Sequence, residues 1–427
     1  MWHARARAMT ISRLELTNFT VFENASFEFC PGINVLIGEN GTGKSHVLKA
    51  MYAFLRAGQE AGQRPPSLIV YPKIAAVFRT GYPVSGPLIR RGASGESLIR
   101  VTDASRNEAH LNLYKGGGNG SYELSARPAI FIPPREVLAM SRGFVAAYEG
   151  RELDFDETYY DLCKALGVLP LKGERAKEFE TMLVPLEQIL GGKVVLAGDR
   201  FLLRQADGDT EAHLVAEGLR KIASIAYLVA NGSLARDSVL FWDEPEAGLN
   251  PALVVKVVEF LRTLAASGVQ VFLASHDYLL VHRLSQVVEY KQEPANFVRF
   301  FSLYRPESGG AVEVEQGNDL FSLEHNAILD EFARYYDDEQ ELSARAMRGE
   351  EAAKAPVKAA AKTRSGSSEK PRAAKKQPTS ERVGVARTSS RRVRTSTSTS
   401  TGAGRCAASG IESRPTRNGS ASHPLAE

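Results

Sequence analysis

One short segment constrains the fold of this chain more than any other. Residues 33–50 read INVLIGENGTGKSHVLKA, which is a largely apolar run ending in glycine, then a glycine-rich loop, then a helical pattern. The loop has the spacing G-x-x-x-x-G-K-[ST], and its place between a buried strand and a helix is the context in which this motif binds phosphates. The sequence therefore predicts an α/β fold of the P-loop NTPase type, with a mostly parallel core sheet.

The loop residues are predicted to bind a nucleoside triphosphate, ATP, together with Mg²⁺. Glycines let backbone N–H groups approach the phosphates, and the helix N-terminus adds a favourable field. Lys44 is expected to reach the β and γ phosphates, and the Ser45 hydroxyl to coordinate Mg²⁺. The alternative is a glycine-rich turn with a chance lysine, which the flanking strand and helix disfavour. The predicted binding residues are Gly38, Glu39, Asn40, Gly41, Thr42, Gly43, Lys44 and Ser45.

A pair of adjacent carboxylates follows a second apolar strand pattern. Residues 238–251 read SVLFWDEPEAGLNP, so Asp243 and Glu244 stand at the carboxyl end of that strand, where α/β sheets place ligands. Asp243 is predicted to hold the magnesium ion, and Glu244 to act as the general base on the attacking water. The competing interpretation, a helix N-cap, is weaker in a chain that already has the phosphate loop.

A histidine follows the next predicted strand. The segment VQVFLASHDYLL contains a buried strand, residues 269–274, that ends in Ser275, His276 and Asp277. A lone histidine is usually structural or exposed. This one ends the strand that comes one helix after Glu244, so we favour a contact between His276 and the γ-phosphate.

Composition is typical of a large globular chain. The 427 residues are 43% hydrophobic and 24% charged, and no apolar run approaches the roughly 20 residues of a membrane span. Cys30, Cys163 and Cys406 have no metal-ligand or redox spacing, which favours reduced thiols. The first residues lack the apolar stretch of a signal peptide. We therefore expect a cytoplasmic protein without membrane insertion.

The positive charge is concentrated towards the C-terminal end. Residues 351–427 contain 16 Lys and Arg and 5 Asp and Glu, a net charge of +11, and the net charge of +3 leaves residues 1–350 at −8. Ser, Thr, Ala, Arg and Lys dominate this segment, so residues 346–427 are predicted to be disordered. A nucleic-acid tether and a simple solvated tail both fit this composition.

The remaining patterns extend the α/β organisation. Residues 10–19 and 23–29 alternate like paired strands, and residues 97–125 contain three β-like runs with a glycine-rich hairpin turn between the last two. A helix-rich stretch runs to residue 190, and regular α/β alternation resumes at residue 217. A strand and a closing helix are expected within residues 311–343.

At these motifs the chain resembles ABC-type ATPases of the SMC/RecF group. It is more similar to bacterial ATP-binding proteins of the AAA-15/AAA-21 type, which include the ATPase part of overcoming-lysogenization-defect nucleases. The resemblance rests on residues 14–45 (LELTNFTVFENASFEFCPGINVLIGENGTGKS), 241–251 (FWDEPEAGLNP) and 272–277 (FLASHD). It covers residues 9 to about 340 and is specific only at these motifs.

The resemblance implies an ABC-ATPase-like head of residues 9–345. It would have a Walker A loop at 38–45, a β and helical insertion at about 60–210, and a region of signature loop, Walker B motif and histidine at 214–277. The implied architecture is a parallel core sheet with an antiparallel β subdomain and an inserted helical lid.

Two such heads would form an ATP-dependent homodimer around two nucleotides. Residues 246–250 would then be the D-loop that reaches across the dimer, and residues 214–221 the signature loop, with Gly218 on the partner's γ-phosphate. The family pattern L-S-x-G is here Val-Ala-Glu-Gly, which loses the serine hydroxyl and adds Glu217. This departure implies slow hydrolysis. Glu136 stands where a Q-loop glutamine is expected and is a candidate contact for the metal or water.

Three functions remain open on the sequence alone. The first is a stand-alone ATPase whose dimerisation switches an effector protein, in phage defence or DNA maintenance, with DNA as one candidate ligand. The second is a non-catalytic ATP sensor, which the altered signature loop permits. The third is the ATP-binding subunit of an ABC transporter, which the 174-residue separation of Lys44 and Gly218 disfavours. The stretch after His276 is too short for a nuclease domain, so a separate partner would have to supply any nuclease activity.

Overall fold

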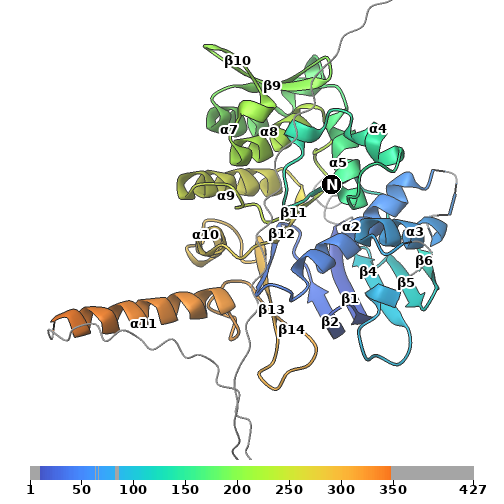
Figure 1. Ribbon diagram of the computed structural model, residues 1–427, viewed down its shortest axis with the longest axis vertical. Helices are drawn as coiled ribbons and strands as arrows, with labels where there is room; N and C mark the ends of the chain where they lie inside the picture. Colours follow the sequence, from blue (N-terminus) through green and yellow to red (C-terminus); the bar gives the residue numbers. More distant parts are fainter. Residues whose placement is uncertain (1–9, 63, 66, 82–85, 348–427) are drawn as a thin grey trace, which may run out of the picture. The chain divides into compact units, whose positions relative to one another are not determined.

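A six-stranded, mostly parallel sheet carries the P-loop (Figure 1). Strands β13 and β14 pair antiparallel, and the other neighbouring strands of this sheet pair in parallel. Every residue of β3, β7, β11 and β12 is buried, which explains why their sequences are nearly continuous apolar runs. In spatial order the strands are β14 (Glu313–Gly317), β13 (Val298–Tyr304), β3 (Ile33–Gly38), β12 (Gln270–Ala274), β11 (Val239–Asp243) and β7 (Ala129–Ile132).

The computed structural model describes residues 10–62, 64–65, 67–81 and 86–347. The predicted tail, residues 346–427, therefore lies outside the described residues except for Ala346 and Met347. Its disorder and its contact with nucleic acid stay predictions. Within the described part of the chain, no helix is both long enough and apolar enough to cross a membrane.

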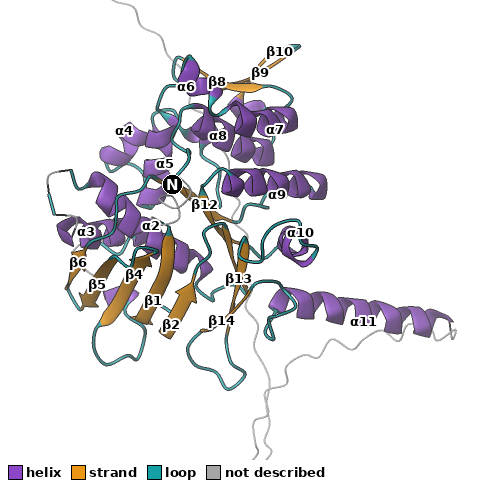
Figure 2. Cartoon of the chain, turned by 180° about the vertical axis from the view of Figure 1, so that it is seen from behind, coloured by secondary structure: helices purple, strands orange, loops and turns teal. Residues whose placement is uncertain are grey.

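Alternate residues of the core strands pack into two separate hydrophobic clusters, one on each face of the sheet. Val35 and Ile37 of β3 pack into one cluster, whereas Leu36 packs into the other, as the two-residue period of a strand requires. Helices cover the first face, and α2 with an antiparallel sheet covers the second (Figures 1 and 2). The helices are α2 (Lys44–Glu60), α8 (Glu217–Ala230), α9 (Pro251–Ala266) and α10 (Tyr278–Glu289).

The antiparallel sheet confirms the predicted β subdomain. Its order is β2-β1-β4-β5-β6, so the hairpin of β1 and β2 joins strands that come about 70 residues later. One detail differs from the prediction, because β6 begins inside the glycine cluster rather than after it. A Cβ on Gly120 would meet the carbonyl oxygen of His110, so this strand needs glycine. The strands are β1 (Ile11–Phe19), β2 (Phe22–Glu28), β4 (Ser97–Asp103), β5 (Glu108–Tyr114) and β6 (Gly117–Tyr122).

The stretch at 60–210 contributes to several layers. Strands β4 to β6 complete the antiparallel sheet, and β7 forms one edge of the core sheet. Between β7 and α8 lie short helices and a three-stranded sheet of order β10-β9-β8. The helices are α4 (Phe144–Glu149), α5 (Glu157–Leu166), α6 (Glu174–Lys177) and α7 (Glu180–Leu190), with the short turns η2 (Leu138–Met140) and η3 (Ala212–Leu214). The strands are β8 (Lys193–Ala197), β9 (Arg200–Gln205) and β10 (Gly208–Glu211).

One helix had no counterpart in the sequence prediction. α3 (Ser67–Phe78) contains Pro72 and a nearly uniform apolar pattern, so its sequence gives no clear helical period. Its buried Lys73 pairs with Glu60 of α2 at 2.7 Å and with Glu157 of α5 at 3.0 Å. This ion-pair cluster ties the P-loop helix to the helical region. The turn η1 (Gly86–Leu88) and the last helix, α11 (Ala327–Met347), complete the described elements.

Candidate nucleotide-binding site

The predicted phosphate loop connects β3 to α2 directly. Gly38, Gly41 and Gly43 have φ angles of 139°, 80° and 94°, a region that favours glycine. Gly43 is the N-cap of α2, and the helix begins at Lys44. A Cβ on Gly38 would meet the carbonyl oxygen of Leu303 in β13, so glycine is also required by packing. The loop has the geometry that the motif predicts, while the phosphate contacts of its residues stay predictions.

Lys44 folds back over this loop. Its Nζ donates to the carbonyl oxygens of Gly38 at 2.7 Å and Glu39 at 2.9 Å. The Thr42 hydroxyl donates to the same Glu39 carbonyl at 2.8 Å. Burial lowers the pKa of Lys44, and the negative charges of Asp243 and Glu244 oppose this shift. The ammonium group is thus held next to the carboxylates of the Walker B strand.

The parallel register brings three strand ends to one edge of the sheet. β12 lies between β3 and β11, and Ala274 pairs with Leu36 on one side and Asp243 on the other. The Ser45 hydroxyl lies near the Asp243 carboxylate. Burial raises the pKa of Asp243 to about 6, even though the nearby Ser45 hydroxyl lowers it. The charge of this buried carboxylate is not fully balanced by its neighbours. Together with the Ser45 hydroxyl it offers oxygen donors, which are the ligands that fit Mg²⁺.

Glu244 has a backbone conformation that is rare for a residue with a side chain. Its φ is 52°, and its N–H donates to the carbonyl oxygen of Ala274 at 2.9 Å. A left-handed conformation at a non-glycine residue costs free energy and persists only where its surroundings fix it. The half-buried Glu244 side chain therefore leaves the strand end in a defined direction, beside Lys44 and Asp243.

Glu246 has a role that the sequence did not indicate. Its buried carboxylate accepts hydrogen bonds from the Ser275 hydroxyl at 2.9 Å and from the His276 N–H at 3.1 Å. His276 Nδ1 is 3.6 Å from the same carboxylate oxygen. Glu246 thus joins the segment after β11 to the segment after β12. The sequence offers one signal for this role, because Glu246 follows Glu244 by two residues. The resemblance assigns Glu246 only to the D-loop.

His276 is exposed at the end of β12, with 54% of its side-chain surface accessible. It lines a cavity of about 430 Å³ together with the first half of the P-loop and the beginning of α11. The histidine therefore stands beside the phosphate loop, as predicted from its strand-end position. Its contact with a γ-phosphate stays a prediction.

The signature loop has a different environment. Leu214 is 71% exposed, and Ala216 and Glu217 are exposed at the start of α8. Gly218 is buried, and a Cβ there would meet the carbonyl oxygen of Gly248. Close packing against the D-loop of the same chain thus explains why residue 218 is a glycine. The predicted contact between Gly218 and a phosphate stays a prediction.

Glu136 is engaged with the signature helix. Its carboxylate forms an ion pair with Arg220, 2.7 Å from Nε, and Nη1 of the same arginine donates to the Val215 carbonyl oxygen at 2.6 Å. Glu136 therefore supports α8, and its predicted contact with the metal or water stays a prediction.

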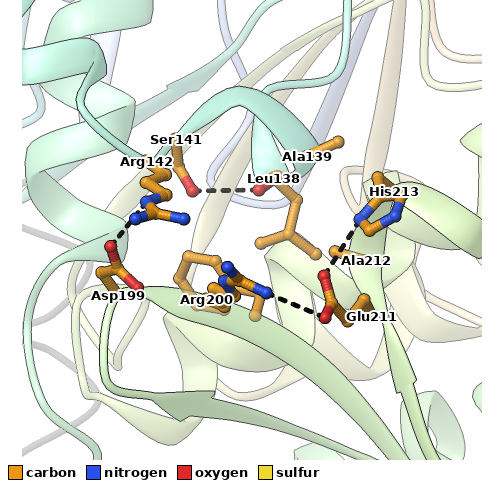
Figure 3. A pocket seen from close by; sticks show the side chains of 10 residues that line it. Leu138, Ala139, Ser141, Arg142, Asp199, Arg200, Glu211, Ala212 and His213 are labelled. Carbon is orange, nitrogen blue, oxygen red and sulfur yellow. Dashed lines mark hydrogen bonds and ion pairs between the residues drawn. The ribbon is translucent and has the colours of Figure 1, made fainter.

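A cavity of about 310 Å³ lies next to the signature loop (Figure 3). Its charged side chains neutralise one another, since Arg142 pairs with Asp199 at 2.6 Å and Arg200 pairs with Glu211 at 3.0 Å. His213 lies 3.3 Å from the same Glu211. The charges of this cavity are thus balanced within the chain.

Two family descriptions match this chain. Residues 9–78, which include the P-loop, match "AAA ATPase domain". Residues 134–282, which include α8, β11 and β12, match "AAA domain, putative AbiEii toxin, Type IV TA system". The two matches thus cover the phosphate loop and the Walker B region separately.

Curated relatives called "DNA replication and repair protein RecF" match parts of the chain. The Clostridium perfringens protein is 38% identical over 71 residues, 17% of this chain and 20% of that protein. The Acidothermus cellulolyticus protein is 42% identical over 141 residues, 33% of this chain and 35% of that protein. The chain therefore spans only about a fifth to a third of the length of these relatives.

Solved SMC heads are also similar. The "SMC head domain from Thermotoga maritima" has a TM-score of 0.42 at 14% identity, over 72% of this chain and 99% of that one. A SmcHead bound to the C-winged helix domain of ScpA has a TM-score of 0.46 at 12% identity, over 72% of this chain and 97% of that one.

Proposed function

We propose that this chain is an SMC/RecF-like P-loop ATPase, and that it hydrolyses ATP with Mg²⁺ at a site completed by a second copy of the chain. The position of the buried Asp243 carboxylate near Ser45 and Lys44, beside Glu244, carries this proposal. It joins the phosphate loop to the Walker B strand at one edge of the sheet, which is the arrangement that phosphoryl transfer to water requires.

Each residue has a distinct task in this proposal. Ser45 and Asp243 would hold the magnesium ion, which supplies a positive charge to the β and γ oxygens when bound. Lys44 binds the same phosphates once it exchanges its carbonyl partners for them. Glu244 accepts a proton from the attacking water. His276 orients the γ-phosphate, and its distance from Glu246 supports a fixed position for the ring.

The exposed signature loop supports completion of the site in a dimer. No hydrogen bond joins residues 214–218 to the P-loop within the described part of the chain. The loop begins a 14-residue helix, whose N-terminus favours an anion, and it presents exposed Leu214. We propose that a second copy brings this loop to the γ-phosphate, and that closure of the dimer switches a partner protein in the cytoplasm, in phage defence or DNA maintenance.

ATP turnover per protomer, measured over a wide range of protein concentration with Mg²⁺, tests this proposal. Because two copies are needed for one complete site, the rate per protomer should rise with concentration and then level off. A rate that is independent of concentration would rule out a shared site.

A nucleotide sensor is the second candidate. Exposed Glu217 at the start of α8 favours it, because a carboxylate at that place repels the partner's γ-phosphate. A sensor would bind ATP and dimerise without turnover at any concentration. The same concentration series, combined with a measurement of ATP affinity, therefore separates the two functions.

A further inference from the structure

Helix α11 (Ala327–Met347) extends away from the rest of the described chain (Figures 1 and 2). Ile328 and Leu329 pack against the main core, and the ring centroid of Phe332 lies 4.3 Å from that of Tyr278. Every residue from 330 to 347 is nevertheless exposed. Most helical stability in proteins comes from packing of an apolar face, and a short helix on its own is marginal in water. Within the described residues, α11 therefore lacks the packing partner that such a helix needs.

Six residues along α11 have the spacing of a coiled-coil seam. Their successive steps are four, three, four, three and four residues, close to the 3.5-residue period that keeps one stripe of a helix facing a partner helix. Within this stripe, Phe332, Tyr335 and Leu342 are 51%, 67% and 65% exposed. We call the stripe the α11 seam, and its members are Ile328, Phe332, Tyr335, Glu339, Leu342 and Ala346.

Glu339 interrupts the apolar seam and decides which arrangement of two α11 helices is favourable. In a parallel pair each seam residue faces its own copy, so two Glu339 carboxylates would meet and repel each other. In an antiparallel pair centred on residue 337, Glu339 faces Tyr335 of the second copy. The Tyr335 hydroxyl can donate a hydrogen bond to that carboxylate. A shift of one heptad would instead place Glu339 against Ile328 or Leu342, which have no donor.

The same antiparallel register pairs the apolar seam residues with one another. Phe332 faces Leu342 of the second copy, and Ile328 faces Ala346, so a larger side chain meets a smaller one in each layer. Because the pair has two-fold symmetry, each contact occurs twice. Tyr336 flanks the seam, is 60% exposed, and lies next to Tyr336 of the second copy near the centre. The α11 seam is therefore complementary to itself in this register.

Charged residues on the other flank favour this register at its ends and oppose it at its centre. Glu331 faces Arg345 of the second copy at both ends. Arg345 also pairs with Glu341 of its own helix, but a guanidinium has several N–H donors and can serve both carboxylates. Asp338 faces Asp338 of the second copy across the two-fold axis, and this repulsion weakens the pair.

We propose that α11 docks on α11 of a second copy as an antiparallel helix pair centred on residue 337. The contact needs no nucleotide, so the inference goes beyond the proposed ATP-dependent dimer and does not rest on it. Each copy contributes one helix of 21 residues, which makes a small interface. The dissociation constant of this contact should therefore be on the order of 10 µM.

Sedimentation equilibrium of the full chain, without nucleotide and with EDTA, tests this inference. The wild-type chain should change from monomer to dimer as its concentration rises. Leu342→Asp should weaken the dimer by more than about tenfold, because it places a charge against Phe332 of the second copy in two layers. Asp338→Asn should strengthen the dimer about two- to threefold, because it removes the repulsion at the centre.

Ala344→Asp is the matched control for Leu342→Asp. It adds the same charge on the opposite, exposed face of α11, so it should leave the dimer nearly unchanged. Circular dichroism and thermal unfolding check that both aspartate variants are folded.

Cysteine cross-linking tests the direction of the pair. Cys30 and Cys163 are buried, and Cys406→Ser removes the third cysteine of the chain. In that background, Phe332→Cys and Leu342→Cys chains should form a disulfide when they are mixed, and neither should form one with itself. Disulfides formed by each variant alone would overturn the antiparallel direction.

Two results would overturn the inference as a whole. One is a chain that stays monomeric at all concentrations without nucleotide, which would leave the proposed ATP-dependent dimer intact. The other is a dimer that Leu342→Asp does not weaken, because the contact would then lie elsewhere on the molecule.

Discussion

The P-loop edge and the signature loop are both parts of the predicted site, but they are organised in opposite ways. At the P-loop edge, Ser45 and Lys44 lie near Asp243, and Glu246 accepts a hydrogen bond from the His276 N–H. At the signature loop, Ala216 and Glu217 are exposed, and Gly218 packs against the D-loop of its own chain. The first region is complete within one chain, whereas the second presents its surface outwards.

This difference separates two properties of the molecule. Nucleotide binding depends on contacts that one parallel sheet brings together, so a single copy should suffice. The proposed hydrolysis would depend on the signature loop, which has no hydrogen bond to the P-loop within the described residues, so it should need a second copy. Variants in the two regions should therefore have separable effects.

The largest effect is expected for Glu244→Gln. The amide cannot accept the proton of the attacking water, so turnover should fall by about 10² to 10⁴. ATP affinity should be retained, because the P-loop is unchanged, and the dimer should persist in ATP. Turnover and light scattering measure the two results. Glu259→Gln, on the exposed face of α9, is the matched control. Near-normal turnover in Glu244→Gln would remove this residue from the chemical step.

Gly218→Ala is expected to have the next largest effect. The new Cβ would meet the Gly248 carbonyl oxygen, a backbone atom that cannot rotate away, so α8 and the D-loop must separate. Such overpacking costs about 1–3 kcal/mol of unfolding free energy. Turnover should fall by at least about tenfold, while the affinity of one copy for ATP is unchanged.

Denaturant unfolding and titration at low protein concentration measure these two quantities. Gly150→Ala is the control, because it adds a methyl group at a helix end where the new Cβ would lie 3.3 Å from the nearest atom, the Ala146 carbonyl oxygen. If Gly218→Ala weakened ATP binding by a single copy, the two regions would not be separable.

Asp243→Asn should show a pH-dependent gain in stability. Burial raises the pKa of Asp243 from 3.8 to about 6, so the folded chain takes up a proton more readily than the unfolded chain. The stability from this group is present below pH 4 and is lost as the pH rises through 6. At pH 7.5 the asparagine variant should be more stable than the wild type by on the order of 2 kcal/mol.

At pH 4 this gain should vanish, because the wild-type carboxyl is then protonated as well. Denaturant unfolding without Mg²⁺ at the two pH values measures the difference. An equal gain in unfolding free energy at pH 4 and pH 7.5 would mean that the burial of the charged Asp243 carboxylate does not cause the gain.

The smallest effect is expected for Glu217→Ser. Removal of an exposed negative charge at the start of α8 should raise turnover about two- to threefold, because the charge no longer opposes the partner's γ-phosphate. The cost is small, about 0.5 kcal/mol of stability, since an acidic residue at a helix N-terminus is mildly favourable. The increase should appear only at concentrations that support the dimer. If turnover were unchanged at both low and high protein concentration, Glu217 would not lie near the nucleotide.

The core elements were predictable because their signals are local. Strand β3, the P-loop and α2 follow from an apolar run, fixed glycine spacing and a helical pattern, and β11 and β12 follow from equally plain runs. Helix α3 was missed because its buried, Pro-containing sequence has no clear period. The start of β6 was misplaced because glycines that usually mark a turn are here needed for close contact between strands.

The sequence alone determined the P-loop, the Walker B carboxylates and the strand-end histidine, since each depends on residue types at fixed short spacing. Only the tertiary structure decided that Glu246 holds Ser275 and His276, that Gly218 packs against Gly248, and that Arg305 lies beside Gly41. These contacts join residues about 30 to 260 positions apart. Strand order and register bring them together, and no local pattern encodes which strands become neighbours.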